Sequence, residues 1–145
     1  MNYSKGSLGR VFMLRFEDGD NLVTELTRLA RKERLKTATL VFIGALKKGK
    51  LVTGPKKPVI PPAANWTGFK DGWEVMGLGT IVSGKEGPQV HVHTTMGKKT
   101  KTLTGCVRKE SEIFLVIEAV VFELKGVKAS KNIDPKTGLN LLRVS

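Results

Sequence analysis

The sequence predicts an α+β domain whose mixed, largely antiparallel sheet of six or more strands is flanked by one or two helices. Two observations support this fold class: one amphipathic helix pattern is visible, and at least six apolar runs have the length of strands. Most connections are too short for crossover helices, so antiparallel pairs should dominate. The 145 residues fit one domain, with a core over about residues 10–124 and a C-terminal loop and edge strand in residues 125–145.

The helix pattern follows the first predicted strand. Residues 10–17 are rich in β-branched and aromatic side chains, and residues 17–20 form a turn. Asp20 or Asn21 can cap a helix that runs to about Arg34. An apolar stripe recurs along this helix at Leu22, Leu26, Leu29 and Ala30.

The rest of the chain alternates strands with loops. Strands are predicted at residues 37–44, 46–53, 72–82, 89–96, 114–124 and 138–144. The second of these should return beside the first as a hairpin partner around Lys47, Lys48 and Gly49. Residues 54–65 carry four prolines and form a loop, and residues 97–103 form a polar turn rich in lysine.

The net charge of +12 concerns partners rather than fold. It attracts nucleic acid, anionic membrane surfaces and small anions, but 18 of the 25 basic residues are lysine, a composition that also suits a thermophile. Both interpretations stay open. The lysines placed in turns, where they can reach DNA phosphates, are Lys47, Lys48, Lys50, Lys56, Lys57, Lys98, Lys99 and Lys101.

The expected location is the cytoplasm, without a membrane partner. One cysteine excludes an internal disulfide and points to a reducing compartment. The longest apolar runs are too short to span a bilayer, and no secretion signal is visible.

A candidate metal site carries the sharpest functional signal. His91 and His93 are the only histidines, and their i, i+2 spacing in a strand points both imidazoles to one face. Cys106, the only cysteine, follows a turn that can bring it back to that face. Two imidazoles and a thiolate leave a tetrahedral zinc ion one open position, as in catalytic sites. The alternative is two ordinary histidines and a buried, inert thiol.

Glu118 interrupts an apolar run and is the candidate catalytic residue. A carboxylate in a buried strand is costly unless it is paired or near a metal. It can orient a histidine or serve as a general base. It can also pair with Arg10 or Arg15, or lie exposed at an edge.

Two other kinds of site are excluded. The chain has no P-loop and no GxGxxG motif. A serine triad lacks its base, since both histidines belong to the candidate metal site.

The order of these features resembles the plant-and-prokaryote-conserved (PPC) domain over roughly residues 10–123. The resemblance is carried by residues 19–22, 40–46, 72–79 and 90–94, by Gly105-Cys106 and by Glu118. It implies a mixed sheet flanked by helices, a homotrimer, and a zinc site in which Cys106 stands where the family has a third histidine. The Arg-Gly-Arg-Pro motif with which plant members contact DNA is absent.

Two functions are therefore expected. The first is a basic homotrimeric DNA-binding or regulatory module that carries a zinc site. The alternative is a zinc-dependent enzyme that acts on a small anionic substrate at His91, His93 and Cys106. The positive charge favours an anion in either case.

Overall fold

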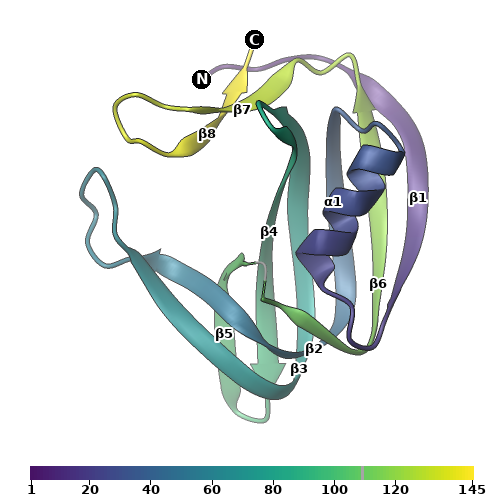
Figure 1. The fold of residues 1–145 in the computed structure, drawn as a ribbon, viewed down its shortest axis with the longest axis vertical. Coiled ribbons are helices and arrows are strands. Elements are labelled where there is room, and N and C mark those ends of the chain that lie inside the picture. Colours follow the sequence, from purple (N-terminus) through teal and green to yellow (C-terminus); the bar gives the residue numbers. More distant parts are fainter. Residues whose placement is uncertain (109) are drawn as a thin grey trace.

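The computed structural model describes residues 1–108 and 110–145, and it confirms the predicted α+β class. Among these residues it contains a single helix and eight strands (Figure 1). In chain order the elements are β1 (Ser7–Glu17), α1 (Leu22–Lys32), β2 (Thr37–Pro55), β3 (Ala64–Gly84), β4 (Gly87–Lys98), β5 (Lys101–Val107), β6 (Glu112–Lys125), β7 (Ala129–Ile133) and β8 (Asn140–Val144).

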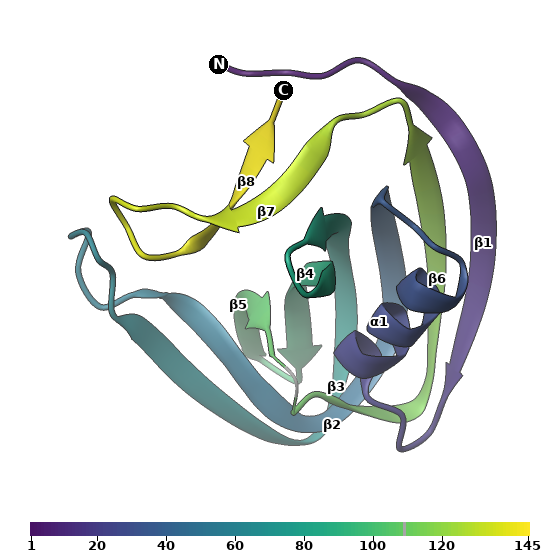
Figure 2. The same cartoon turned by 45° about the horizontal axis from the view of Figure 1, so that its top comes forward.

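The strands form one mixed sheet in the order β1-β6-β2-β5-β4-β3-β7-β8, with a further pairing between β2 and β3. The pairs are antiparallel except β3 with β7, which is parallel. Because β2 pairs with both β3 and β5, the strands β2, β3, β4 and β5 close a ring of pairings. The β7–β8 hairpin crosses one end of this ring, near the start of β4 (Figure 2).

Strand β2 corrects the sequence prediction. Residues 46–53 do not fold back on residues 37–44, because β2 runs without reversal beside β3 from Thr37 opposite Val82 to Pro55 opposite Ala64. The Lys47–Gly49 segment coincides with a register shift between Leu46 and Lys48 rather than with a turn. A bulge bends a strand without ending it, and this explains why turn residues occur inside it.

The lysine-rich turn and the C-terminal region also differ from expectation. β4 ends at Lys98 and β5 begins at Lys101, so the turn predicted over residues 97–103 is limited to residues 99 and 100. β7 was not predicted; it pairs with β8 to form a hairpin. The proline-rich loop is confirmed, since β2 ends at Pro55 and β3 begins at Ala64.

Helix α1 covers the inner face of the sheet. Its N-cap is Asn21, whose side-chain oxygen accepts a hydrogen bond from the Thr24 amide at 3.1 Å. Leu22, Leu26 and Ala30 are buried, as the stripe predicts. They share one core with the inward-facing side chains Leu40, Phe42, Ile81, Val92, Ile113, Ile117 and Val121. The described helix is not long and apolar enough to cross a membrane.

The outer face of the sheet is also apolar, although α1, the single helix of the described residues, lies on the other face. Alternation along β2 buries Leu40 and Phe42 and exposes the intervening Val41 and Ile43. Met13, Met76 and Leu78 extend this exposed surface across β1 and β3. Together with Glu118 and His93, these residues line a hollow of about 520 Å³.

Arg10 connects β1, on which it lies, to β6 and to the end of α1. Its guanidinium donates to both carboxylate oxygens of Glu123 on β6, at 2.8 and 3.0 Å. It also donates to the side chain and the backbone carbonyl of Glu33 at the end of α1, at 3.0 and 2.8 Å. The ion pair suggested between Arg10 and Glu118 is therefore replaced by one with Glu123.

Candidate metal centre

The alternation of β4 sets the two histidines side by side. Val92, Thr94 and Met96 are buried toward the core, so His91 and His93 project from the opposite face. Their Nε2 atoms lie 3.2 Å apart. The ring planes are inclined at 72°, with centroids 4.9 Å apart. This edge-to-face arrangement directs both Nε2 atoms toward one region.

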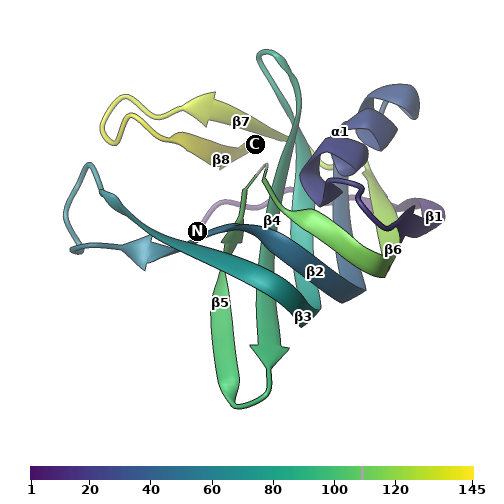
Figure 3. The same ribbon diagram turned by 60° about the horizontal axis from the view of Figure 1, so that its bottom comes forward.

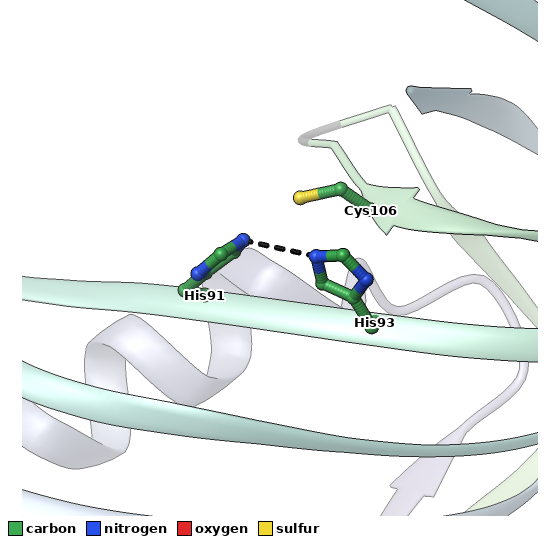
Figure 4. Close-up of side chains that lie close together, drawn as sticks. All are labelled: His91, His93 and Cys106. Carbon is green, nitrogen blue, oxygen red and sulfur yellow. Dashed lines mark hydrogen bonds between the residues drawn. The ribbon is translucent and has the colours of Figure 1, made fainter. Parts of the chain in front are cut away.

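Cys106 reaches the same region from the neighbouring strand. In the antiparallel β4–β5 pair, Cys106 lies directly opposite His93, so the two side chains share a face. Figure 4 shows the sulfur of Cys106 pointing toward the facing nitrogens of the two rings. The potential ligand atoms of the three residues all lie within 4.8 Å of one another. Cys106 is buried, His91 is half-buried and His93 is exposed.

This donor set fits zinc. Tetrahedral zinc with Zn–N bonds of about 2.0–2.1 Å holds two ligand nitrogens roughly 3.3 Å apart. The observed 3.2 Å between the Nε2 atoms matches that spacing. Imidazole and thiolate are the ligands that zinc prefers, and three of them leave one position for a further ligand.

Burial and positive charge set the protonation of the centre. Desolvation, helped by the charges of Lys131, His93 and Arg108, lowers the pKa of His91 to about 4. Burial raises the pKa of the Cys106 thiol, while Arg108 and Lys131 oppose this rise. At neutral pH the His91 imidazole is therefore unprotonated, which is the form that binds a metal.

Lys131 and Arg108 are the residues of this neighbourhood that sequence reasoning missed. Lys131 comes from the unpredicted strand β7, opposite Gly84 of β3, and burial lowers its pKa. Arg108 follows β5, and its guanidinium lies 5.9 Å from the centre of the Trp66 ring. The i, i+2 spacing of Cys106 and Arg108 was the one available signal.

Glu118 lies on the outer, exposed face of β6 rather than inside a buried layer. β6 is an interior strand between β1 and β2, so the exposure does not come from a sheet edge. Among the described residues Glu118 makes no ion pair and no hydrogen bond with either histidine. Arg15 lies opposite it in register but pairs with Glu17. Glu118 and His93 line the same hollow.

The eight lysines proposed to reach DNA fall into two groups. The first group is held by carboxylates: Lys47 by Asp18 and Glu112, Lys48 by Glu112, Lys50 by Glu110, and Lys98 by Asp71. The second group is exposed and has no ion pair within the described part of the chain: Lys56, Lys57, Lys99 and Lys101. Its members occupy two separate tips, the β2–β3 loop and the β4–β5 hairpin, which projects beyond β2 and β3 (Figure 3).

Solved structures share this fold. A PPC protein from Pyrococcus horikoshii is 28% identical, with a TM-score of 0.85 over 96% of this chain and 94% of that one. A metal-containing protein from Archaeoglobus fulgidus is 21% identical, with a TM-score of 0.84 over 99% of both chains. A protein from Ralstonia eutropha JMP134, named as a candidate DNA-binding protein, is 18% identical, with a TM-score of 0.77 over 92% and 90%.

The comparison with curated proteins found no match. The family model described as the Plants and Prokaryotes Conserved (PCC) domain, the PPC domain of the resemblance, matches residues 3–125. That match covers most of the β-sheet, the helix and all three residues of the candidate metal centre. The chain therefore belongs to the Plants and Prokaryotes Conserved domain family.

Proposed function

We propose that this chain is a zinc-binding, homotrimeric regulatory module that binds DNA through its positive charge. The observation that carries the zinc assignment is the convergence of His91, His93 and Cys106 within 4.8 Å. The metal-containing relative from Archaeoglobus fulgidus has the same fold and supports a metal in this family. Zinc is the metal that a mixed imidazole and thiolate set favours.

The metal content of the purified protein tests this assignment. Protein prepared without added metal or chelating resin should contain about one zinc per chain. Cys106→Ala should lose it. A matched control is Ser83→Ala, a small polar residue on β3 outside the centre. A wild-type protein that takes up no zinc, even when zinc is added back, would overturn the assignment.

The homotrimer rests on the family resemblance and on the apolar outer face. Val41, Ile43, Met76 and Leu78 are each about half exposed or more, on neighbouring strands. An apolar surface of this kind marks an interface in a stable protein. A second and third copy of the same chain are the occupants that we propose, because a closed symmetric assembly covers every such face equally.

DNA binding is supported by the net charge of +12 and by the relative from Ralstonia eutropha. The exposed lysines without carboxylate partners are the ones to contact phosphates. The slope of log K against log salt concentration reports the number of phosphate contacts, at about one unit per contact. The double variant Lys56→Gln with Lys57→Gln should therefore lower this slope for duplex binding by about two units. Lys48→Gln with Lys50→Gln removes the same charge from lysines already paired with carboxylates and should change the slope less. Absence of binding to any duplex at low salt contradicts this part of the proposal.

A zinc-dependent enzyme acting on a small anionic substrate is the second candidate. It is favoured by a three-residue donor set, which leaves a place for substrate. Zinc in such a site supplies Lewis-acid polarisation. Glu118 lines the hollow beside His93 and is the candidate general base. In hydrolase and lyase screens with anionic substrates, Glu118→Gln should keep its zinc and lose activity; equal activity would remove Glu118 from that role.

A further inference from the structure

Two cationic side chains flank the His91–His93–Cys106 centre. Arg108 continues the pairing of β5 with β2, since its amide donates to the carbonyl oxygen of Lys50, and Val107 between it and Cys106 points into the core, so Arg108 leaves the chain on the face of Cys106. Lys131 lies opposite Gly84 of β3, the strand that pairs with the histidine strand β4. In agreement with these positions, the charges of both residues act on His91 and on the Cys106 thiol. They come from different elements, since Lys131 belongs to β7 and Arg108 follows β5. Two cations beside a metal site are unfavourable unless an anion offsets them.

Neither cation has a carboxylate partner in the described part of the chain. Within residues 1–108 and 110–145, no carboxylate lies within ion-pair distance of Lys131 or Arg108. By contrast, Lys47, Lys48, Lys50 and Lys98 all have carboxylate partners. Lys131 is also partly buried, unlike the free lysines at the loop tips. A half-buried cation without a counter-ion is costly, and this points to a ligand that supplies the charge.

The charge balance sets the kind of ligand. A divalent zinc ion with two neutral imidazoles and one thiolate carries a net charge of about +1. Lys131 and Arg108 raise the local total to about +3. A neutral fourth ligand would leave this charge unbalanced in a partly buried place. An oxyanion with about two negative charges offsets most of it.

We propose that Lys131 and Arg108 form the anion-recognition pair of the metal centre and select a small oxyanion with about two negative charges. This inference rests on the proposed zinc site. Arg108 offers a planar fork of N–H donors, and Trp66 beside it supports its orientation. Lys131 acts as a point charge that the β7–β8 hairpin brings to the site. Dicarboxylates and phosphate share the required chemistry, and separate probes distinguish them.

Cobalt substitution provides the test, because Co²⁺ accepts the same ligands as zinc and its absorption spectrum reports on its coordination. The cobalt-loaded protein is titrated with malonate, with inorganic phosphate and with neutral imidazole. In Lys131→Gln, the dissociation constants of the two anions should rise about tenfold, whereas that of imidazole should not rise. Lys131→Arg should restore anion binding. Lys128→Gln, at an exposed lysine just before β7, should leave all three constants unchanged.

Arg108→Gln provides an independent variant and should raise the dissociation constants of the same two anions, malonate and phosphate. Removal of either cation should also strengthen cobalt uptake itself, because a positive charge near the ion is lost. If the site selects dicarboxylates, these variants should lose more affinity for malonate than for phosphate. If it selects phosphate, they should lose more affinity for phosphate.

The outcomes separate this inference from the proposed function. Normal cobalt uptake with unchanged malonate and phosphate constants in Lys131→Gln overturns the anion pair alone. An equal loss of affinity for imidazole and for the anions in Lys131→Gln also overturns the anion pair, because that pattern indicates a structural role of Lys131. Failure of the wild-type protein to take up any metal overturns both the zinc site and this inference.

Discussion

Nε2 of His91 lies 3.2 Å from Nε2 of His93, so the two rings point these nitrogens at each other above one face of β4. Two neutral imidazoles can satisfy this contact only if the Nε2–H of one ring donates a hydrogen bond to the unprotonated Nε2 of the other. A metal ion placed between them accepts both lone pairs without that requirement. The geometry therefore suits a metal ion bound by both nitrogens. Without a metal, one hydrogen bond between the rings takes its place.

The first prediction concerns the pH dependence of the metal-free protein. The folded pKa of His91 is about 4, below the ordinary value of 6.5. The unfolded chain therefore binds this proton more tightly than the folded one. The contribution of His91 to the free energy of unfolding should be constant above about pH 6.5 and should become progressively more unfavourable between pH 6.5 and 4. Urea unfolding over that range measures it.

His91→Gln is the control for this pH effect. It removes the titrating group and should flatten the stability curve between pH 6.5 and 4. A variant with the same curve as the wild-type protein would show that His91 titrates normally in the folded state.

The second prediction concerns Gly77, which keeps β3 close to the core and to β4. A Cβ atom at this position would overlap both the ring of the buried Phe42 and the backbone carbonyl oxygen of His93. Gly77→Ala should therefore lower the free energy of unfolding by about 1–3 kcal/mol. It should also weaken zinc binding, since relief of the clash moves the backbone that carries His93.

Gly97→Ala is the matched control, because a Cβ atom on Gly97 meets no other atom within 4 Å. Its stability should change by no more than about 0.5 kcal/mol. Isothermal titration with zinc and urea unfolding measure both variants. Equal effects of the two substitutions would show that the close approach at Gly77 does not control the centre.

The third prediction concerns the Arg10–Glu123 ion pair. Hydrogen bonds from the Arg10 side chain and backbone lower the pKa of Glu123 to about 2. Since this folded pKa is below the ordinary value of 4.5, the stabilisation is present above about pH 4.5 and is lost as the pH falls toward 2. Glu123→Gln should lower the free energy of unfolding at pH 7 by about 1 kcal/mol. Thermal unfolding at pH 7 and at pH 2 provides the measurement.

Glu17→Gln removes a carboxylate from a more exposed pair with Arg15 and serves as the comparison. It should cost only a few tenths of a kcal/mol at pH 7. If Glu123→Gln costs no more than Glu17→Gln, the junction of β1, β6 and α1 does not depend on Arg10.

The helix and most strands could be predicted because their patterns are local. Asn21 and the stripe of Leu22, Leu26 and Ala30 define α1 within one segment of sequence. The single strand β2 could not be predicted from its own residues. Lys47, Lys48 and Gly49 are typical of a turn, but the partner β3 continues alongside them. Pairing over a long strand overrode the local preference.

In the candidate centre, too, residues with a local sequence pattern could be predicted, and residues placed by long-range pairing could not. The i, i+2 spacing placed His91 and His93 on one face, and the return of the chain after a turn placed Cys106 beside them. Lys131 lies on a strand without a clear pattern, and its approach depends on the long-range pairing of β7 with β3. The sequence overestimates the burial of Glu118, because an apolar run broken by a single charge is typical of a strand that is buried on both faces. The outer face of β6 is instead only partly covered within one chain, since Glu118 is exposed and its neighbours Val116 and Val120 are partly buried.

The last prediction concerns that outer face and the proposed trimer. Leu78 is 62% exposed, so its replacement costs the single chain little packing. In a trimer that buries the face, Leu78→Glu would place a charge in an apolar interface, which is strongly unfavourable. Sedimentation should show the wild-type protein at about three times the mass of the 15.9-kDa chain and Leu78→Glu at the mass of one chain. Leu142→Glu, at a residue of β8 that is 52% exposed and outside this hollow, should remain trimeric. A wild-type protein that sediments as a single chain would contradict the trimer, whereas a trimeric Leu78→Glu would move the interface to another surface.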